Sequence, residues 1–207
     1  MTSRSKKASL TGVVVMFLVC HPMVGSAGEP TEQLQQTIDS LLAVLKSPDL
    51  MGEGKAKERR QKLRKIIYPR FDFPEMAKRA LGSHWQRRSP EEQKEFIKLF
   101  TGLLEDAYLD TIESYKGEKV RYLNERQDKN FAQVDTKILD PQGQEYSVNY
   151  RLHKSGSDWK VYDVVVENIS LVNNYRSQFN RILAKSSYEE LIAAMKDRKL
   201  SAPSKKS

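Results

Sequence analysis

Residues 146–183 read YSVNYRLHKSGSDWKVYDVVVENISLVNNYRSQFNRIL. Apolar residues alternate with polar ones over 146–152, and this period of two predicts a half-buried strand. The Ser-Gly-Ser at 155–157 predicts a hairpin turn, and the β-branched and aromatic run 159–166 predicts a central return strand. Ser170 can then cap an amphipathic helix that folds back over the sheet. The stretch therefore predicts the core of a two-layer domain.

The patterns on either side extend this arrangement. Helical apolar stripes begin at Thr31, begin again after a cap at Asp72, and occupy 89–115 behind a Ser-Pro-Glu-Glu capping box. The period changes to two over 120–138, which predicts two more strands, and Ser187 caps a last helix. The order of helices, strands and helices predicts an α+β fold: a four-stranded antiparallel meander sheet packed against several helices.

The two ends of the chain are set apart by composition. Three cationic residues precede the apolar run 10–20, and small residues follow it, so residues 1–27 are predicted to be a signal peptide cleaved near Ala27. A membrane anchor is the alternative, but this run is short of the roughly 20 residues that a spanning helix needs. The predicted domain is 28–200, with a polar flexible tail at 201–207.

Charge and cysteine content narrow the class of partner. The signal peptide contains three cations and no acid, so its removal lowers the formal net charge from +8 to +5, and Cys20 leaves with it. An exported chain without cysteine depends on its apolar core rather than on disulfides. Mild positive charge in that compartment points away from nucleic acid and toward anionic lipid or acidic partners. The basic stretch 55–65 is interpreted as an exposed helix face in preference to a docking patch.

The sequence offers little support for catalysis. The mature chain has only His84 and His153, and it has no spaced ligand set for zinc, no nucleophile elbow and no phosphate-binding glycine loop. Asp163 falls within a strongly apolar strand, where a carboxylate needs partners, so we expect it to bond to a helix terminus or to pair with an arginine such as Arg176. We therefore predict no enzymatic activity, no catalytic residue, no metal and no cofactor.

Six motifs in order carry a resemblance to a known family. They are Phe71-Asp72-Phe73, Met76-Ala77, Leu81-Gly82 with Trp85, the Phe96/Phe100 helix, Trp159 to Val164, and Ser170-Leu171-Val172 with Tyr175 to Phe179. With them, residues 38–191 resemble the MlaC (toluene-tolerance) family of periplasmic phospholipid-binding proteins, auxiliary components of ABC transporters. One departure is Asn168, where the family usually has glycine; asparagine is the next most tolerant residue for positive φ.

The resemblance implies a monomeric periplasmic lipid carrier. It would hold the acyl chains of a phospholipid cargo in a cavity between sheet and helices. It would shuttle that lipid between an outer-membrane lipoprotein–porin complex and an inner-membrane ABC transporter with an MCE-domain protein, maintaining outer-membrane lipid asymmetry. The predicted lipid-binding residues are Phe73, Met76, Phe100, Leu103, Tyr108, Val148, Tyr150, Leu152, Leu171, Tyr175 and Phe179. The same residues suit an ordinary core equally well, since both need apolar stripes.

Three alternatives stay open from the sequence. The cargo could be another lipid such as a hopanoid, because the family includes paralogues linked to hopanoid metabolism. The protein could instead be a periplasmic interaction module whose groove accepts a peptide or helix. A small α+β hydrolase is the third, and it would depend on Asp163 as its carboxylate.

Overall fold

The computed structural model describes residues 28–200, which form six α-helices, three short 3₁₀ helices and five strands. The predicted signal peptide and the predicted tail lie outside the described residues. The helices are α1 Glu29–Lys46, α2 Ala56–Arg70, α3 Phe73–Leu81, α4 Pro90–Glu113, α5 Leu171–Leu183 and α6 Tyr188–Lys196, with 3₁₀ turns at Pro48–Leu50, Glu53–Lys55 and Gly82–Arg87. The strands are β1 Lys119–Asp128, β2 Phe131–Leu139, β3 Glu145–Ser155, β4 Asp158–Val166 and β5 Ile169–Ser170.

The sheet is an antiparallel meander in the order β1-β2-β3-β4-β5. The prediction of four strands was one short. Glu167 and Asn168 both have positive φ, 48° and 65°, and turn the chain tightly enough for Ile169 and Ser170 to pair with the end of β4. Asn168 thus adopts the conformation that its place in the sequence suggested.

β1 is also longer than its apolar pattern predicted. Only residues 120–122 alternate clearly, yet the strand continues to Asp128. The register shifts between Tyr122 and Asn124, which places Leu123 in a bulge and interrupts the period of two. The remaining residues of β1 are mostly polar and exposed, so hydropathy alone did not reveal them.

The predicted helix caps are confirmed. Asp72, Ser170 and Ser187 each accept a hydrogen bond from a backbone N–H three residues on, and Ser89 forms a complete capping box with Glu92. These local bonds satisfy N–H groups that would otherwise lack partners at the helix starts.

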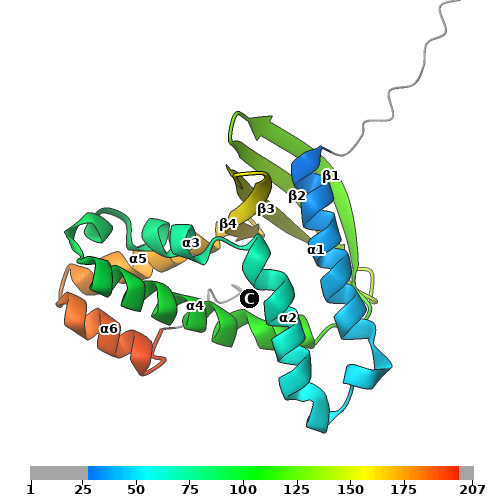
Figure 1. Ribbon diagram of the computed structural model, residues 1–207, viewed down its shortest axis with the longest axis horizontal. Coiled ribbons are helices and arrows are strands. Elements are labelled where there is room, and N and C mark those ends of the chain that lie inside the picture. The colour runs from blue at the N-terminus through cyan, green and yellow to red at the C-terminus, as the bar shows by residue number, and fades with distance from the viewer. Residues whose placement is uncertain (1–27, 201–207) are drawn as a thin grey trace, which may run out of the picture.

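One helix packs along the sheet, and four others form a group beside it. α1 lies along the sheet, α3 to α6 gather to one side, and α2 crosses the end of α4 between them (Figure 1). Leu34 of α1, Leu152 of β3, Phe100 of α4 and Leu191 of α6 belong to a single apolar core. Within residues 28–200, no helix is both long enough and apolar enough to span a bilayer.

Candidate functional site

The inner face of the sheet carries the predicted strand positions. The register pairs Tyr150 with Val134 and Leu152 with Ala132, so the apolar alternation of β2 and β3 lies on one face. Leu152 is fully buried, whereas Tyr150 keeps part of its surface accessible. Burial nonetheless raises the pKa of Tyr150 to about 12. Tyr150 therefore lies deep among protein atoms without being completely covered by them.

An aromatic cluster occupies the space between α4 and α5. The Phe100 ring stacks on Phe96 at 6.0 Å between centroids and meets Tyr175 edge-on at 5.4 Å and Phe179 at 6.0 Å. All of these side chains are completely enclosed. Such offset and edge-on contacts are favourable beyond the burial of area. Each ring in this structure is thus covered by protein side chains alone.

The predicted lipid-binding residues come together in space but differ in burial. All of them belong to the core or pack against it. Enclosed almost completely are Met76, Phe100, Leu152, Tyr175 and Phe179; between 7% and 8% exposed are Phe73, Leu103, Val148 and Leu171; half-buried are Tyr108 and Tyr150. Because a side chain with no accessible surface presents nothing to a ligand unless it moves, the second and third groups are the better candidates for contact.

Other half-buried apolar residues pack against the same core and were not predicted as site residues. They include Leu42 of α1, Ile67 of α2, Val120 and Tyr122 of β1 and Ile138 of β2. Val120 pairs with Ile138, so both lie on the inner face with Val134 and Tyr150. The apolar alternation of β2 and the stripe of α1 already contained this signal, but neither distinguishes partial from complete burial.

Three tyrosine hydroxyls in this region are buried, those of Tyr108, Tyr122 and Tyr175; the first and third neighbour each other, and the Tyr122 hydroxyl has no hydrogen-bond partner among the described residues. Leaving a buried hydroxyl unpaired costs about 1–3 kcal/mol. Burial raises the pKa of Tyr108 and of Tyr122, and it raises the pKa of Tyr175 to about 12, so all three are neutral phenols near pH 7. The interior is therefore apolar but contains three buried hydroxyl groups.

Asp163 joins the sheet to the helices. One carboxylate oxygen accepts hydrogen bonds from the Ser170 hydroxyl at 2.6 Å and the Arg151 guanidinium at 3.1 Å; the other accepts from the Val172 N–H at 3.1 Å. The predicted bond to a helix terminus is confirmed, but the arginine is Arg151. Arg176 instead donates to the backbone carbonyl of Arg79. With both of its oxygens engaged, Asp163 holds the start of α5 rather than facing a substrate.

The Phe71-Asp72-Phe73 motif fastens the junction of α2 and α3 to the sheet. Phe71 forms a bridge with Val161, and the Asp72 N–H donates to the Val161 carbonyl at 2.8 Å. One Asp72 oxygen caps α3, and the other lies 2.9 Å from His153 Nε2. His153 is not a freely exposed histidine: only 21% of its side chain is exposed, and it contacts Asp72.

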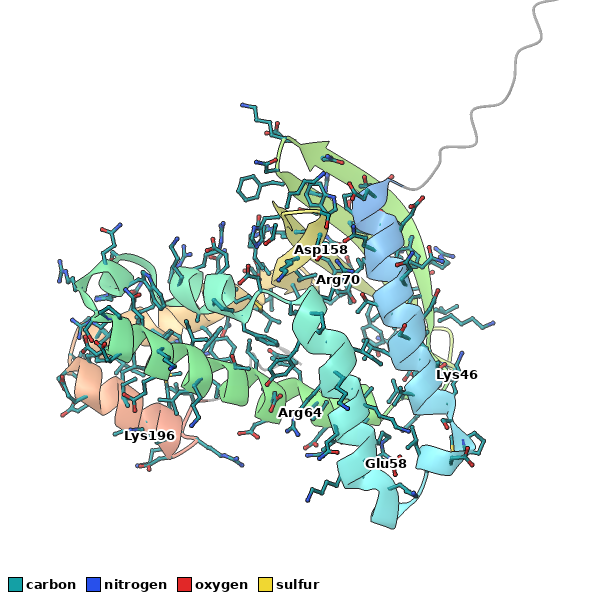
Figure 2. The ribbon with its side chains drawn as sticks, viewed as in Figure 1. Lys46, Glu58, Arg64, Arg70, Asp158 and Lys196 are labelled. Atoms are coloured by element: carbon teal, nitrogen blue, oxygen red, sulfur yellow. The ribbon has the colours of Figure 1, made fainter. Side chains whose placement is uncertain are left out.

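The basic stretch 55–65 proves to be largely an intramolecular contact. Arg64 lies on the side of α2 that faces α4 (Figure 2) and binds Glu105 through two nitrogens. Arg59 and Arg60 both bind Glu113, whose side chain is only 7% exposed. The interpretation of the stretch as a simple exposed face was therefore wrong for its arginines. Sequence spacing could not reveal pairs between two helices.

Arg70 is the last residue of α2 and connects this helix to α1 and the sheet. Its guanidinium donates to Thr37 and Gln33 of α1 and to the backbone carbonyl of Trp159 on β4. Burial lowers the pKa of Arg70, with partial compensation from Asp158. These contacts hold α1, α2 and the sheet around the half-buried residues.

Within residues 28–200, no group of three or more histidine, cysteine or acidic side chains could hold a metal ion. Two open hollows, of about 370 and 310 Å³, border Arg151 and carry mainly polar side chains; the first lies beside β5 and the start of α5, and the second lies beside the hairpin of β1 and β2. They are separate from the apolar interior between the sheet and the helices.

Comparison with known proteins gives consistent matches. Residues 35–197 match the family model described as MlaC protein. The chain is 26% identical over 195 residues to the intermembrane phospholipid transport system binding protein MlaC of Haemophilus influenzae, covering 90% of this chain and 89% of that protein. It is 25% identical over 170 residues to the toluene tolerance protein ttg2D of Pseudomonas putida, covering 81% and 79%.

A solved structure also matches the fold. It is the phospholipid-binding protein of Ralstonia solanacearum in complex with a phospholipid, with a TM-score of 0.74 and 27% sequence identity. The match covers 83% of this chain and 97% of that protein.

Proposed function

The chain belongs to the MlaC family, and on that premise we propose that it is a periplasmic carrier of phospholipid rather than an enzyme. The observation that carries the proposal is the set of half-buried apolar side chains that face the interior from α1, α2, α4 and three strands. A relative with the same fold binds a phospholipid. The acyl chains would cover the surface that the protein's own side chains leave accessible.

The wall of the proposed lipid site follows from burial. Tyr108 and Tyr150 are the predicted residues with the most accessible surface, and Leu42, Val120 and Ile138 extend the wall onto α1, β1 and β2. Tyr150 lies on the inner face of the sheet and is half-buried, so a ligand between the sheet and the helices would reach it without displacing protein atoms. The enclosed rings around Phe100 would form the floor behind that wall rather than contact the lipid directly.

Hydrocarbon burial supplies ample energy for holding a lipid. A diacyl lipid has about 30 methylenes, each worth roughly 0.8 kcal/mol when removed from water. Even after the loss of translational and conformational freedom, such a ligand needs no strong headgroup contact. Release into water would carry most of the same cost, so the lipid would pass directly to a docked acceptor.

That energetic argument favours the transport route that the family implies. The carrier would exchange lipid with an inner-membrane ABC transporter bearing an MCE-domain protein and with an outer-membrane lipoprotein–porin complex. This exchange would maintain outer-membrane lipid asymmetry. Residues 1–27 would direct export, and the mature chain would act as a monomer.

Solvent extraction of the purified protein followed by mass spectrometry tests the proposal. We expect phospholipid in stoichiometric amount. A hopanoid in its place would change the cargo, and an empty but stable protein would favour the interaction module. Either of those outcomes contradicts phospholipid carriage.

A pair of tryptophan variants separates a lipid site from ordinary core. Ile138 is half-buried, and the larger side chain of Ile138→Trp would occupy the space proposed for lipid. This variant should therefore bind less lipid with little change in melting temperature. The control Leu191→Trp overpacks a fully enclosed position, which typically costs about 1–3 kcal/mol, and should lower the melting temperature without changing lipid per folded molecule. Equal loss of melting temperature in both variants, with unchanged lipid, would argue for a solid core.

A further inference from the structure

The outward side of α2 and of the turn before it is cationic and accessible. Its exposed cations, defined here as the lysine face, are Lys55, Lys57, Lys62 and Lys65. Glu58 is the one acidic residue in the stretch 55–65, so the lysine face together with Glu58 carries a formal charge of +3. The side chains of Lys55 and Lys62 are 52% and 48% exposed. A partner can therefore reach these ammonium groups without any movement of the protein.

The arginines of the same stretch point the other way and are already engaged. Arg64 faces α4 (Figure 2) and binds Glu105 at 2.9 and 3.1 Å. Arg59 and Arg60 bind the two oxygens of Glu113. A guanidinium suits such fixed carboxylate pairs, whereas an ammonium is a compact point charge on a flexible stem. The helix thus fastens itself to α4 with arginines and presents lysines to the solvent.

The protein neutralises the lysine face only in part. Glu58 is shared between Lys55, at 3.0 Å, and Lys62, at 3.1 Å. Lys57 and Lys65 form no ion pair with any residue in the range 28–200. Lys62 and Lys65 are also one helical turn apart, where like charges repel each other. An anionic surface would relieve this repulsion.

Exposed apolar side chains lie at both ends of the lysine face. Tyr68 is 45% exposed and Met51 is 58% exposed. The Arg59 guanidinium donates to the Leu50 carbonyl at 3.0 Å, which holds Met51 beside the first turns of α2. The Tyr68 ring packs on Phe73, with 5.0 Å between the ring centroids. Tyrosine rings beside cationic side chains are typical of the headgroup region of a bilayer.

We propose that the lysine face docks the protein on an anionic membrane surface, with its ammonium groups on lipid phosphates and with Tyr68 and Met51 at the level of the headgroups. This goes beyond the proposed function, because a lipid held in the interior requires no membrane contact on α2. Each lysine near an anionic bilayer strengthens binding about fivefold, so four of them give a weak and reversible association. An acidic protein suits the face less well, because arginine is the better partner for fixed carboxylates and the arginines here are paired.

Vesicle flotation with the purified mature protein tests the proposal. The anionic vesicles contain equimolar phosphatidylcholine and phosphatidylglycerol, and the neutral vesicles contain phosphatidylcholine alone. The double variant Lys57→Gln, Lys65→Gln should bind the anionic vesicles about 25-fold more weakly, and Glu58→Gln should bind them about fivefold more tightly. Raising the NaCl concentration from about 0.05 M to about 0.5 M should remove the binding, because salt screens exposed charges.

Two exposed lysines on another helix provide the matched control. Lys94 and Lys98 are four residues apart on α4, and neither forms an ion pair with another described residue. The double variant Lys94→Gln, Lys98→Gln lowers the net charge by the same amount but should weaken binding by no more than about twofold, because charges beyond a Debye length from the membrane are screened. The double variant Lys57→Arg, Lys65→Arg keeps the charge and should keep the binding. All of these variants replace exposed side chains, so their melting temperatures should match that of the unmodified protein.

The outcomes separate the lysine face from the proposed function. Equal binding of the unmodified protein to neutral and anionic vesicles, or equal losses in the two glutamine double variants, would refute the membrane contact. Binding to a glutamate-rich peptide without binding to anionic vesicles would assign the face to an acidic protein and overturn the proposal. Bound phospholipid, measured in the same samples, should be unchanged by every variant. Its absence from the unmodified protein would contradict lipid carriage, whereas the vesicle result alone decides the docking surface.

Discussion

Replacing Asp163 with alanine would remove the polar contact that joins β4 to the start of α5. The carboxylate is 3% exposed and accepts three hydrogen bonds, from the Ser170 hydroxyl, the Val172 N–H and Arg151. Alanine leaves the N–H of the helix start without an acceptor and the buried end of the Arg151 guanidinium without a counter-ion. The alternative of a hydrolytic role for Asp163 predicts no loss of stability.

The size of the effect follows from these contacts. Breaking a buried charged pair by removing one partner costs about 3–5 kcal/mol. The Arg151 side chain is 38% exposed and can regain water, so we expect the lower end, about 3 kcal/mol. In a domain of this size, each kcal/mol lowers the melting temperature by about 2–4 °C, which gives a decrease of roughly 6–12 °C.

Urea unfolding followed by circular dichroism measures this loss, with Asp158→Ala as the control. Asp158 is an exposed carboxylate on the same strand, so its removal should change the free energy of unfolding by less than about 0.5 kcal/mol. A double-mutant cycle should show stronger coupling of Asp163 to Ser170 than to the partly solvated Arg151. A loss below about 1 kcal/mol for Asp163→Ala, or equal effects at Asp163 and Asp158, would refute the structural role.

Three other perturbations probe the framework. Glu113→Gln should lower the free energy of unfolding by about 2 kcal/mol in urea titrations, because it weakens two arginine contacts to a buried carboxylate. Glu58→Gln on the exposed face of α2 should change it by less than about 0.5 kcal/mol, and equal values would contradict the pairing. The backbone φ of Asn168 is 65°, which glycine adopts more easily than asparagine and alanine adopts less easily. Asn168→Gly should therefore leave the free energy of unfolding unchanged or raise it, and Asn168→Ala should lower it by about 1 kcal/mol, as measured by thermal melting. The reverse order would exclude backbone strain. Burial raises the pKa of Tyr150 and Tyr175 to about 12 from 10.0, so the folded state retains protons that the unfolded state loses. Stability should be constant below about pH 10 and fall toward about pH 12, with tyrosinate absorbance appearing together with unfolding; absorbance that rises while the protein stays folded would contradict the burial.

Local patterns determined most of the secondary structure. The period of two over 146–152, the turn at 155–157 and the cap at Ser170 specify a hairpin followed by a helix, and the structure contains both. The capping box at Ser89 likewise marks the start of α4. These features could be predicted because each depends on residues within one helical turn or one hairpin. The same argument explains why the bulge in β1 and the short β5 were missed: they depend on pairing rather than on hydropathy.

Tertiary structure decided the partners of the polar residues. His153 contacts Asp72 across 81 residues of chain, and Arg64 contacts Glu105 across 41. The register of β3 on β4 shifts just after Arg151, and in that register Arg151 rather than Arg176 lies opposite Asp163. A charged residue in a sequence shows that it needs water or a counter-ion, but only the fold determines which of several candidates comes within reach.

The candidate site was also predicted from the sequence only in part. The sequence determined which residues leave water, and every predicted lipid-binding residue belongs to the interior. It could not distinguish Phe100, which protein atoms enclose completely, from Tyr150, which keeps accessible surface. The physical reason is that an apolar stripe is driven away from water equally well by side chains or by a ligand, and only the spacing of the packed layers decides which of them fills the space.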